Sequence, residues 1–445
     1  MAITRTRERI IIVGAAGRDF HDFNVAFRDD PTVQVVAFTA AQIPGIEGRR
    51  YPPALAGPHH PDGIPIEPEA RLESLVAEHD ATEVVFSYSD VTHEHVMHLA
   101  SRSLAVGAGF RMLGPRRTML RSRRPVIAVC AVRTGCGKSP ACRYVARVLR
   151  EEGLRVAVVR HPMPYGDLLR MRVQRFGSLA DLDAEGDDIT LEEREEYEPH
   201  VEAGTTVWAG VDYAEILARA EDETDVLVWD GGNNDLPFLR PDLWITLADP
   251  HRSGHEHAYH PGEANLRAAD VVVVTKADTA PPGTVGELRI SVARANPRAQ
   301  VIVTDMPVKT EEPELVAGKR VLVIEDGPTL THGGMPHGAG FVAARALGAE
   351  PVDPRSAAVG SIRRLYDAHP HLGPVLPAMG YYPEQLDELR RTIAGVDCDA
   401  IVVATPVDLR RQVPLHRPST RVRYELADHG APTLASALRT FLASR

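Results

Sequence analysis

Apolar residues along this chain form short unbroken runs, and these runs alternate with stretches that carry the spacing of an amphipathic helix. Buried strands are predicted at 9–13, 33–38 and 83–88, and helices are predicted after the first strand and at 71–79. Strands that alternate with helices indicate a parallel sheet covered by helices. We therefore expect an α/β fold that begins with a Rossmann-like parallel-sheet domain over residues 1–122.

A second α/β unit is expected from residue 123, after the linker MLRSRRP. Its strands are predicted at 125–132, 155–159, 226–229, 243–248, 271–275, 301–303 and 321–325. We assign residues 123–345 to this domain, which carries the nucleotide motifs described next. Residues 346–445, with predicted strands at 399–404 and 422–426 and a helix at 433–442, are expected to form an α/β extension that completes it.

The strand at 125–132 leads into RTGCGKS, which opens a predicted helix. Gly137, Lys138 and Ser139 match the end of the phosphate-binding pattern G-x-x-x-x-G-K-[ST], although Val132 stands at its first position. Gly135 and Gly137 let backbone amides approach phosphate oxygens at the helix N-terminus. The lysine neutralises the β- and γ-phosphates, and the serine hydroxyl binds Mg²⁺. The pattern predicts a P-loop for a nucleoside triphosphate, whose other residues are Arg133, Thr134 and Cys136.

Two further motifs follow apolar strands. Asp230 begins WDGGNND after VLVW, where P-loop proteins place the carboxylate that orders Mg²⁺. The segment TKAD, with Lys276 and Asp278, is similar to the N-K-x-D loop that reads guanine, but Thr275 replaces the asparagine. A carboxylate there accepts hydrogen bonds from the base, while ATP-using proteins carry similar loops. The motif therefore leaves ATP and GTP both open.

Three polar segments come directly after predicted strands, where α/β proteins gather ligands. They are VVRHPMPYGDL with Arg160, His161, Tyr165 and Asp167; LADPHRSGHEHAYHPGE with His251, Arg252, His255, Glu256, His257, His260 and Glu263; and VIEDGPTLTHGGM with Glu325, Asp326, Thr329, Thr331 and His332. The His-rich segment is compatible with an anion pocket, a polar surface loop or a metal site. We favour the anion pocket, because glycine and proline interrupt any helical His-x-x-x-His face. The acidic run 181–198 is expected to be a solvated insertion.

Composition narrows the class of protein. The net charge of −11 argues against a nucleic-acid binder, and no stretch has the ~20 apolar residues that span a bilayer. The start of the chain does not read as a signal peptide, and the cysteines form no CxxC pair, so we expect a cytoplasmic protein. Cys130, Cys136 and Cys142 cluster around the P-loop, where a helix N-terminus lowers a thiol pKa. The lysines are Lys138, Lys276, Lys309 and Lys319, and two of these lie in nucleotide motifs.

Taken together, RHPMPYGDL, WDGGNND, HEHAYHPGE, TKAD and VIEDGPTLTHGGM resemble the cyclic 2,3-diphosphoglycerate synthetases over nearly the whole chain. The resemblance implies an ATP-dependent ligase that closes 2,3-bisphosphoglycerate into a cyclic pyrophosphate and releases ADP and phosphate. It also implies Mg²⁺, held by Ser139 and Asp230, and we expect a homodimer. ATP would phosphorylate one phosphate to a mixed anhydride, and the neighbouring phosphate would then expel inorganic phosphate.

Under this hypothesis Lys138, Asp230, Arg160 and His161 are the expected catalytic residues. The residues expected to contact the bisphosphoglycerate, or a related small anionic substrate, are Arg160, His161, Arg252, His255, His257 and Glu263. Val132 in the P-loop and the Arg-rich composition depart from what the family leads us to expect, which leaves open a changed substrate on the same fold.

Three other functions stay open at this point. The first is a GTP-hydrolysing metallochaperone or switch that uses the His-rich segment, for which GTP preference and bound metal would be the test. The second is an ATP-dependent carboxylate or phosphate ligase with a different acceptor. The third is a non-enzymatic sensor in which the N-terminal GAAG turn binds a small ligand.

Overall fold

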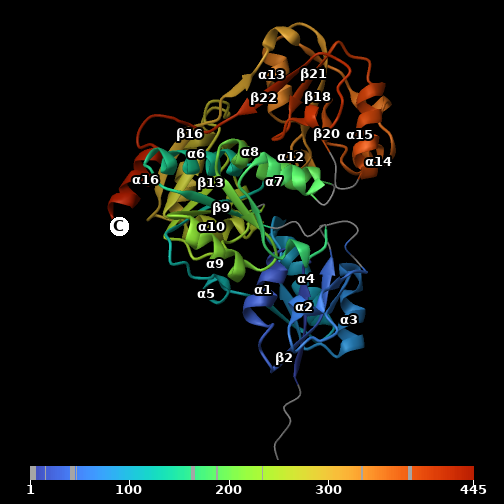
Figure 1. Cartoon of the computed structure of the whole chain (residues 1–445), viewed down its shortest axis with the longest axis vertical. Coiled ribbons are helices and arrows are strands. Elements are labelled where there is room, and N and C mark those ends of the chain that lie inside the picture. Colours follow the sequence, from blue (N-terminus) through green and yellow to red (C-terminus); the bar gives the residue numbers. More distant parts are fainter. Residues whose placement is uncertain are drawn as a thin grey trace, which may run out of the picture.

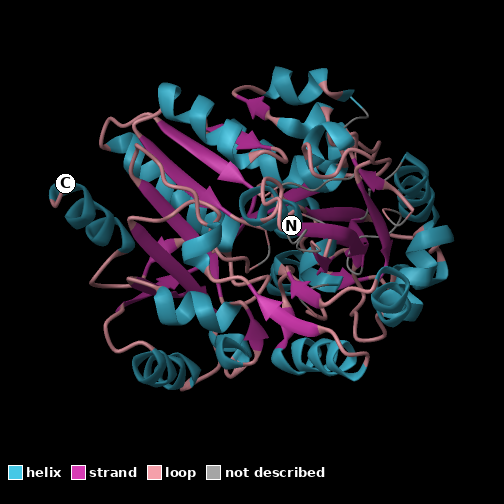
Figure 2. Cartoon of the chain, turned by 90° about the horizontal axis from the view of Figure 1, so that it is seen from below, coloured by secondary structure: helices cyan, strands magenta, loops and turns pink. Residues whose placement is uncertain are grey.

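The computed structural model describes residues 7–15, 17–40, 46, 48–161, 166–186, 189–232, 234–331, 334–378 and 383–445. The chain is mixed α/β with parallel sheets, built as three bodies that follow one another along its long axis (Figure 1). Helices flank the strands of these bodies in the view of Figure 2. None of the helices in the described ranges is long and apolar enough to cross a membrane.

The first sheet has the strand order β3-β4-β2-β1-β5-β7. Its strands are β1 (Glu8–Val13), β2 (Val33–Ala40), β3 (Arg50–Tyr51), β4 (Ile64–Pro68), β5 (Glu83–Phe86) and β7 (Gly109–Met112). The helices are α1 (Arg18–Ala26), α2 (Pro53–Ala56), α3 (Leu72–His79), α4 (His93–Ala105) and α5 (Pro115–Thr118). Strand β1 pairs in parallel with both β2 and β5, so the strand order changes direction between β1 and β5. The carboxyl ends of these two strands form the edge where such sheets bind ligands.

The second sheet has the order β10-β11-β9-β12-β8-β13-β15-β16-β23. Its strands are β8 (Val126–Ala131), β9 (Val156–Arg160), β10 (Gln174–Phe176), β11 (Thr206–Ala209), β12 (Val226–Asp230), β13 (Leu243–Ala248), β15 (Val271–Val274), β16 (Gln300–Asp305) and β23 (Ala427–Asp428). The helices are α6 (Lys138–Glu151), α7 (Leu179–Ala184), α8 (Leu191–Glu202), α9 (Tyr213–Glu223), α10 (Gly262–Ala268), α11 (Thr284–Ala295) and α16 (Leu434–Ala443). Strands such as β15 are buried throughout because helices cover both faces of the parallel sheet.

The third sheet has the order β17-β22-β21-β18-β19, with β20 also beside β18. Its strands are β17 (Val308–Thr310), β18 (Arg320–Asp326), β19 (Glu350–Pro351), β20 (Leu376–Ala378), β21 (Ala400–Ala404) and β22 (Ser419–Tyr424), and its helices are α12 (Gly327–Thr331), α13 (Ala339–Ala346), α14 (Gly360–Ala368) and α15 (Pro383–Gly395). The strand expected at 321–325 in the second sheet therefore lies in this third sheet. Its partners β20 and β21 come from later in the chain, which local sequence pattern does not reveal.

Short elements complete and connect the bodies. The 3₁₀ helices are η1 (Glu69–Arg71), η2 (Arg170–Arg172), η4 (Pro250–Arg252), η5 (His255–His257), η6 (Pro313–Leu315), η7 (Pro354–Ser356) and η8 (Leu409–Arg411). The ribbon formed by β6 (Val91–Thr92) and β14 (Tyr259–His260) joins the first body to the second. After the third sheet the chain returns to the second, where β23 pairs with β16 and α16 packs near α6. The Tyr144 hydroxyl fixes this return by donating to the Asp428 carboxylate at 2.6 Å.

The acidic run 181–198, expected to be a solvated insertion, is instead folded and largely packed. It contributes to α7 and α8, and each helix begins with a capping box, in which Ser178 pairs with Asp181 and Thr190 pairs with Glu193. Glu198 is buried and pairs with Arg194 at 3.0 Å. Buried carboxylates are tolerated when cations pair with them, so the abundance of acidic residues alone was a poor guide to exposure.

Candidate functional site

A cavity of about 840 Å³ lies among the three bodies. Residues from all three line it: Arg18, Ser89 and Asp90 from the first; Lys138, Ser139, Arg160, His161 and Asp235 from the second; and Glu325, Asp326, Thr405 and Arg421 from the third. The carboxyl ends of parallel strands in each body therefore open toward one space. This convergence identifies the cavity as the candidate active site.

The P-loop forms one side of the cavity. Gly135 and Gly137 have φ values of +83° and +91°, which glycine adopts without strain. A Cβ at Gly137 would lie 2.3 Å from the Met306 Cε atom. Helix α6 begins at Lys138, and among the described residues no side chain caps its N-terminus. The uncapped amides and the helix dipole favour a phosphate group at this position.

Val132, at the first position of the P-loop pattern, is held through its backbone. The Asn234 side chain donates to the Val132 carbonyl at 3.1 Å. Gly262, at the start of α10, packs so tightly against that carbonyl that a Cβ there would lie 1.9 Å from the oxygen. The loop is therefore anchored by its neighbours even though its first residue carries a side chain.

Asp230, at the end of β12, is completely buried and is surrounded by cationic or polar partners. Its Oδ1 accepts from Lys138 Nζ at 2.6 Å, and its Oδ2 lies 2.7 Å from Arg160 and 3.0 Å from His200 Nε2. Burial alone would raise the pKa of Asp230, but the charges of Arg160 and Lys138 hold it well below its ordinary value. We call Gly135–Ser139, Arg160 and Asp230 the phosphate wall.

Helix α8 supplies two residues of this network that the sequence did not single out. His200 is buried behind Asp230, and burial lowers the pKa of its imidazole. Glu196 pairs with the guanidinium of Arg160. The signal for both residues lies only in the tertiary structure, because α8 is distant in sequence from the P-loop and carries no recognisable motif.

A second group lies beside the phosphate wall and is centred on Asp235. Its Oδ2 is 3.2 Å from His161 Nε2, and its Oδ1 accepts from Arg18 Nε at 2.8 Å. Burial would raise the pKa of Asp235, but Arg18 and His161 lower it to about 2. Arg18 also donates to the Leu236 carbonyl. We call Arg18, His161, Gly232 and Asp235 the histidine wall.

Two glycines make room for the His161 ring. A Cβ on Gly17 would lie 2.4 Å from His161 Cε1, and a Cβ on Gly232 would lie 3.0 Å from His161 Cγ. Gly17 belongs to the turn between β1 and α1 of the first body, while Gly232 follows β12 of the second. Gly17 and Gly232 therefore share one role, which is to let the two bodies close around this imidazole.

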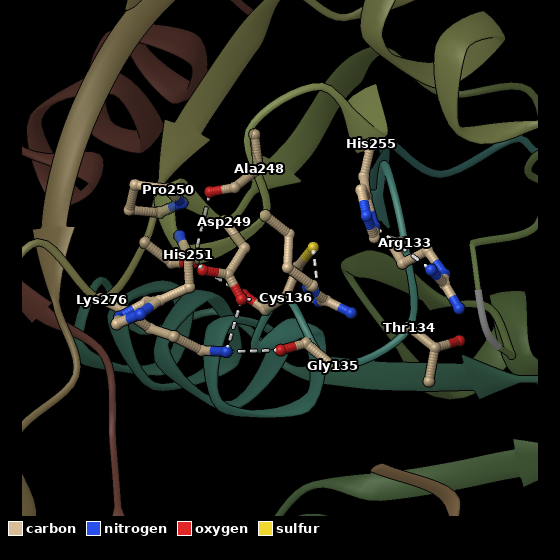
Figure 3. Close-up of polar contacts among 12 residues, drawn as sticks. Arg133, Thr134, Gly135, Cys136, Ala248, Asp249, Pro250, His251, His255 and Lys276 are labelled. Carbon is tan, nitrogen blue, oxygen red and sulfur yellow. Dashed lines mark hydrogen bonds and ion pairs between the residues drawn. The ribbon is translucent and has the colours of Figure 1, made fainter. Parts of the chain in front are cut away.

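Figure 3 shows the polar contacts behind the P-loop. Lys276 Nζ donates to the Gly135 carbonyl and to Asp249 Oδ2, each at 2.7 Å. Arg133 lies over the Tyr259 ring at 3.7 Å and contacts His255 Nδ1 at 3.2 Å. Lys276 thus supports the backbone of the P-loop from the end of β15. Asp278, the other predicted base-reading residue, accepts from the Met306 amide at 2.9 Å.

The predicted site residues separate into two groups. Arg133, Thr134, Gly135, Gly137, Lys138, Ser139, Arg160, His161 and Lys276 line the cavity, and Asp230 lies directly behind them. Among the described lining residues we do not find Cys136, Asp278, Arg252, His255, His257 or Glu263. Arg252 instead contacts Cys136 Sγ at 3.5 Å, and His257 contacts Ser291 at 2.9 Å. Tyr165 and His332 lie outside the described residues.

The cysteines near the P-loop are buried, and burial raises the pKa of Cys130, Cys136 and Cys142. The expectation of a lowered thiol pKa at this helix N-terminus is therefore wrong, because desolvation outweighs the helix dipole. Within the described ranges, no group of His, Cys, Asp and Glu side chains is arranged to hold a metal ion.

Comparison with known proteins gives a match over nearly the full length of the chain. The arginine synthetase ArcE of Thermococcus kodakarensis is 57% identical over 435 residues, which cover 98% of this chain and 97% of that protein. A cyclic 2,3-diphosphoglycerate synthetase of Rubrobacter xylanophilus is 28% identical over 257 residues, which cover 49% of this chain and 55% of that protein. No family model matches the chain.

Solved structures resemble the chain more distantly. LpxK from Aquifex aeolicus in complex with ATP is 12% identical with a TM-score of 0.44, and the match covers 84% of this chain and 99% of that one. A ParA family ATPase from Chlorobium tepidum is 15% identical with a TM-score of 0.25, over 41% of this chain and 84% of that one.

These findings overturn the hypothesis of a cyclic 2,3-diphosphoglycerate synthetase. The full-length relative is an arginine synthetase, whereas similarity to the cyclic diphosphoglycerate enzyme covers half of the chain. The physical reason is that a motif such as WDGGNND contributes Asp230 to the phosphate wall, and a site for the nucleotide does not specify the acceptor. The comparisons do not support the GTP-hydrolysing metallochaperone either.

Proposed function

Because the chain belongs to the family of the arginine synthetase ArcE, we propose that it is an ATP-dependent ligase that completes the guanidinium group of arginine. The observation that supports this most directly is the Lys138–Asp230–Arg160 network at the N-terminus of α6, which borders the cavity of about 840 Å³. This is the arrangement that phosphoryl transfer from a nucleotide to a small acceptor requires.

The acceptor follows from the chemistry of the product. A guanidinium forms from a ureido group when nitrogen replaces the ureido oxygen, and that oxygen is a poor leaving group. ATP solves this problem by transferring its γ-phosphoryl group to the ureido oxygen, which releases ADP. A nitrogen donor then attacks the activated carbon, the carbon–oxygen bond breaks, and the oxygen leaves as inorganic phosphate. We therefore propose a ureido amino acid, the citrulline type, and ammonium as co-substrates.

The phosphate wall supplies the groups for the first step. Lys138 and the α6 amides bind the β- and γ-phosphates, and for this Lys138 exchanges Asp230 Oδ1 for a phosphate oxygen. Arg160, buried and bordering the cavity, balances the negative charge of the transferred phosphoryl group. Ser139 and the ionised Asp230 fit the hard oxygen ligands that Mg²⁺ takes, and the ion would draw charge from the phosphates.

The cavity also carries carboxylates that suit a cationic product. Among those on its described lining are Glu195, Glu202, Asp326 and Glu425. Carboxylates bind a guanidinium or an α-ammonium group through paired, charge-assisted hydrogen bonds.

The test is to incubate the purified protein with Mg²⁺, ATP, citrulline and ammonium, and to quantify arginine and the nucleotide product by chromatography. We expect one ADP per arginine, and no arginine when any component is omitted. Lys138→Ala is the matched control and should lower arginine formation by about 10²–10³-fold. ATP turnover without arginine would contradict the proposal, and AMP as the product would contradict the γ-phosphoryl step.

A further inference from the structure

We propose that His161 is the base that accepts a proton from the attacking nitrogen, and that Asp235 and Arg18 are the residues that position it. The inference deepens the proposed function and rests on it, because it assigns the proton transfer of the second step to a named group. It also gives the first body a part in catalysis, since Arg18 and Gly17 belong to that body.

His161 lies where the acceptor must lie. It follows Arg160 at the end of β9, and it borders the cavity next to Gly232, which follows Asp230 at the end of β12. In a P-loop fold the γ-phosphate points toward the ends of these strands, so a group bound there meets the transferred phosphoryl. The His161 side chain keeps 14% of its surface exposed, which leaves it accessible from the cavity.

The pairing with Asp235 prepares His161 to act as a base. A carboxylate that accepts from Nε2 selects the tautomer in which Nδ1 carries the lone pair, and it stabilises the imidazolium that forms after proton transfer. Arg18 keeps Asp235 ionised, because a completely buried carboxylate without a cation would take up a proton. Arg18 and Asp235 thus hold the His161 imidazole in one orientation at the edge of the cavity.

The other charged groups around His161 do not compete with Asp235. On α1, Asp22 lies 3.6 Å from Arg18, and burial raises the pKa of Asp22 to about 7. His21 bonds to the Thr118 carbonyl, and burial lowers the pKa of the His21 imidazole to about 3, so His21 is neutral at pH 7. Asp235 is therefore the ionised partner that faces the imidazole.

The proton transfer balances the reaction. Ammonium has four N–H bonds and no lone pair, so it must lose a proton before it attacks carbon. His161 accepts that proton, the nitrogen–carbon bond forms, and the carbon–oxygen bond breaks with its electron pair going to the departing phosphate. A second proton of the nitrogen leaves with the phosphate, and His161 returns its own proton to solvent. The products are the guanidinium, hydrogen phosphate and one proton.

Other histidines at the site fit this role less well. Of those on the described lining, His251 bonds to the Thr279 hydroxyl at 3.0 Å, and His337 stacks on the Phe341 ring at 4.4 Å. His200 is completely buried behind Asp230 and does not reach the described lining of the cavity. His161 combines a place on the cavity with a carboxylate partner.

The experiment separates the two steps in His161→Ala, Asp235→Asn and the wild-type chain. Exchange of labelled ADP into ATP, with citrulline present and ammonium omitted, reports phosphoryl transfer alone, while arginine formation reports both steps. For His161→Ala we expect arginine formation to fall about 10²-fold at pH 7 with the exchange rate nearly unchanged. The defect should shrink as the pH rises, because free ammonia then needs no base.

The matched control is His429→Ala, which removes an exposed histidine that pairs with Asp305 at 2.8 Å and is not on the described lining of the cavity, and it should leave both rates unchanged. Equal losses of exchange and arginine formation in His161→Ala, or a defect that does not depend on pH, would overturn the inference. So would an unchanged rate of arginine formation. A wild-type chain that forms no arginine would instead contradict the proposed function, so the two failures are distinguishable.

Discussion

The phosphate wall centres on a buried aspartate at the end of β12, and the histidine wall centres on another shortly after it. The two aspartates differ in how firmly their partners are held in place. Asp230 binds Lys138, Arg160 and His200, and Lys138 must leave it to reach a phosphate. Asp235 holds Arg18 and His161, and Arg18 is fixed further by the Leu236 carbonyl and by the Phe238 ring 5.0 Å away. The phosphate wall must therefore rearrange when its substrate binds, whereas the histidine wall is already assembled.

We expect the largest loss of stability from Asp230→Asn. It removes the negative charge that Lys138, Arg160 and His200 share and leaves Glu196 as the paired carboxylate of Arg160, so we expect the free energy of unfolding to fall by about 3–5 kcal/mol. Asp235→Asn should cost less, because Arg18 keeps Asp22 and the Leu236 carbonyl. Urea denaturation of both variants measures the difference, and equal losses would show that the two aspartates are equivalent.

Glu325 is another buried carboxyl group, but backbone amides hold it instead of cations, with Phe341 N donating at 2.8 Å. Burial raises its pKa from 4.5 to about 7, so the folded chain keeps a proton that the unfolded chain loses. The resulting stabilisation is fully present below pH 4.5 and is lost as the pH rises through 7. It amounts to at most about 3 kcal/mol.

Glu325→Gln removes this titration. The free energy of unfolding of the variant should therefore decline less than that of the wild type between pH 4.5 and 8, as measured by urea denaturation at each pH. Glu314→Gln, at an exposed glutamate of the same body, is the control and should follow the wild type. Parallel curves for Glu325→Gln and the wild type would contradict a protonated Glu325.

Gly17→Ala tests whether the histidine wall is preassembled. The added methyl group would lie 2.4 Å from His161 Cε1 and push the ring out of place, so we expect kcat for arginine formation to fall about tenfold with KM for ATP unchanged. Gly107→Ala is the matched control, because Gly107 also has a positive φ, of +87°, but has open space around it. A similar loss in both variants would trace the effect to backbone strain.

His257→Ala should have the smallest effect. Its imidazole is 39% exposed and contacts Ser291 outside the described lining of the cavity. We expect arginine formation within about twofold of the wild type, as is usual for surface substitutions. A tenfold loss of arginine formation would instead indicate that the His-rich segment contributes to the substrate site.

The sequence predicted the phosphate wall well because its parts are local. The spacing of glycine, lysine and serine between a strand and a helix predicts the P-loop, and the position of Asp230 at the end of a buried strand predicts its place beside that loop. The alternation of strands and helices likewise predicted parallel sheets. Membership of a sheet was harder: the apolar run of β18 would suit any parallel sheet, and only its pairing with β20 and β21 places it in the third.

His161 was predicted as a catalytic residue, but its partners in the histidine wall and the contribution of α8 were not, for a related reason. Arg18 lies 217 residues from its partner Asp235, and no spacing rule connects them. The acidic composition of α8 suggested solvent exposure, because the cations that neutralise it, such as Arg160, come from other elements. The family resemblance did not identify the acceptor, because WDGGNND and TKAD place Asp230 and Lys276 around the P-loop, and the P-loop binds the nucleotide.

The path of the chain into and out of the third sheet has a mechanical consequence. It enters through β16 and β17 and leaves through β22 and β23, and these passages run side by side: Val308 pairs with Tyr424, and Asp305 pairs with Ala427. The chain thus enters and leaves the third body through one two-stranded ribbon. Helix α8 is a second attachment, because Leu191 packs in the core of the third body and Glu198 lies 3.5 Å from Arg411. A rotation of the third body about the ribbon would therefore have to break these contacts before it could move Glu325 and Arg421 relative to Lys138.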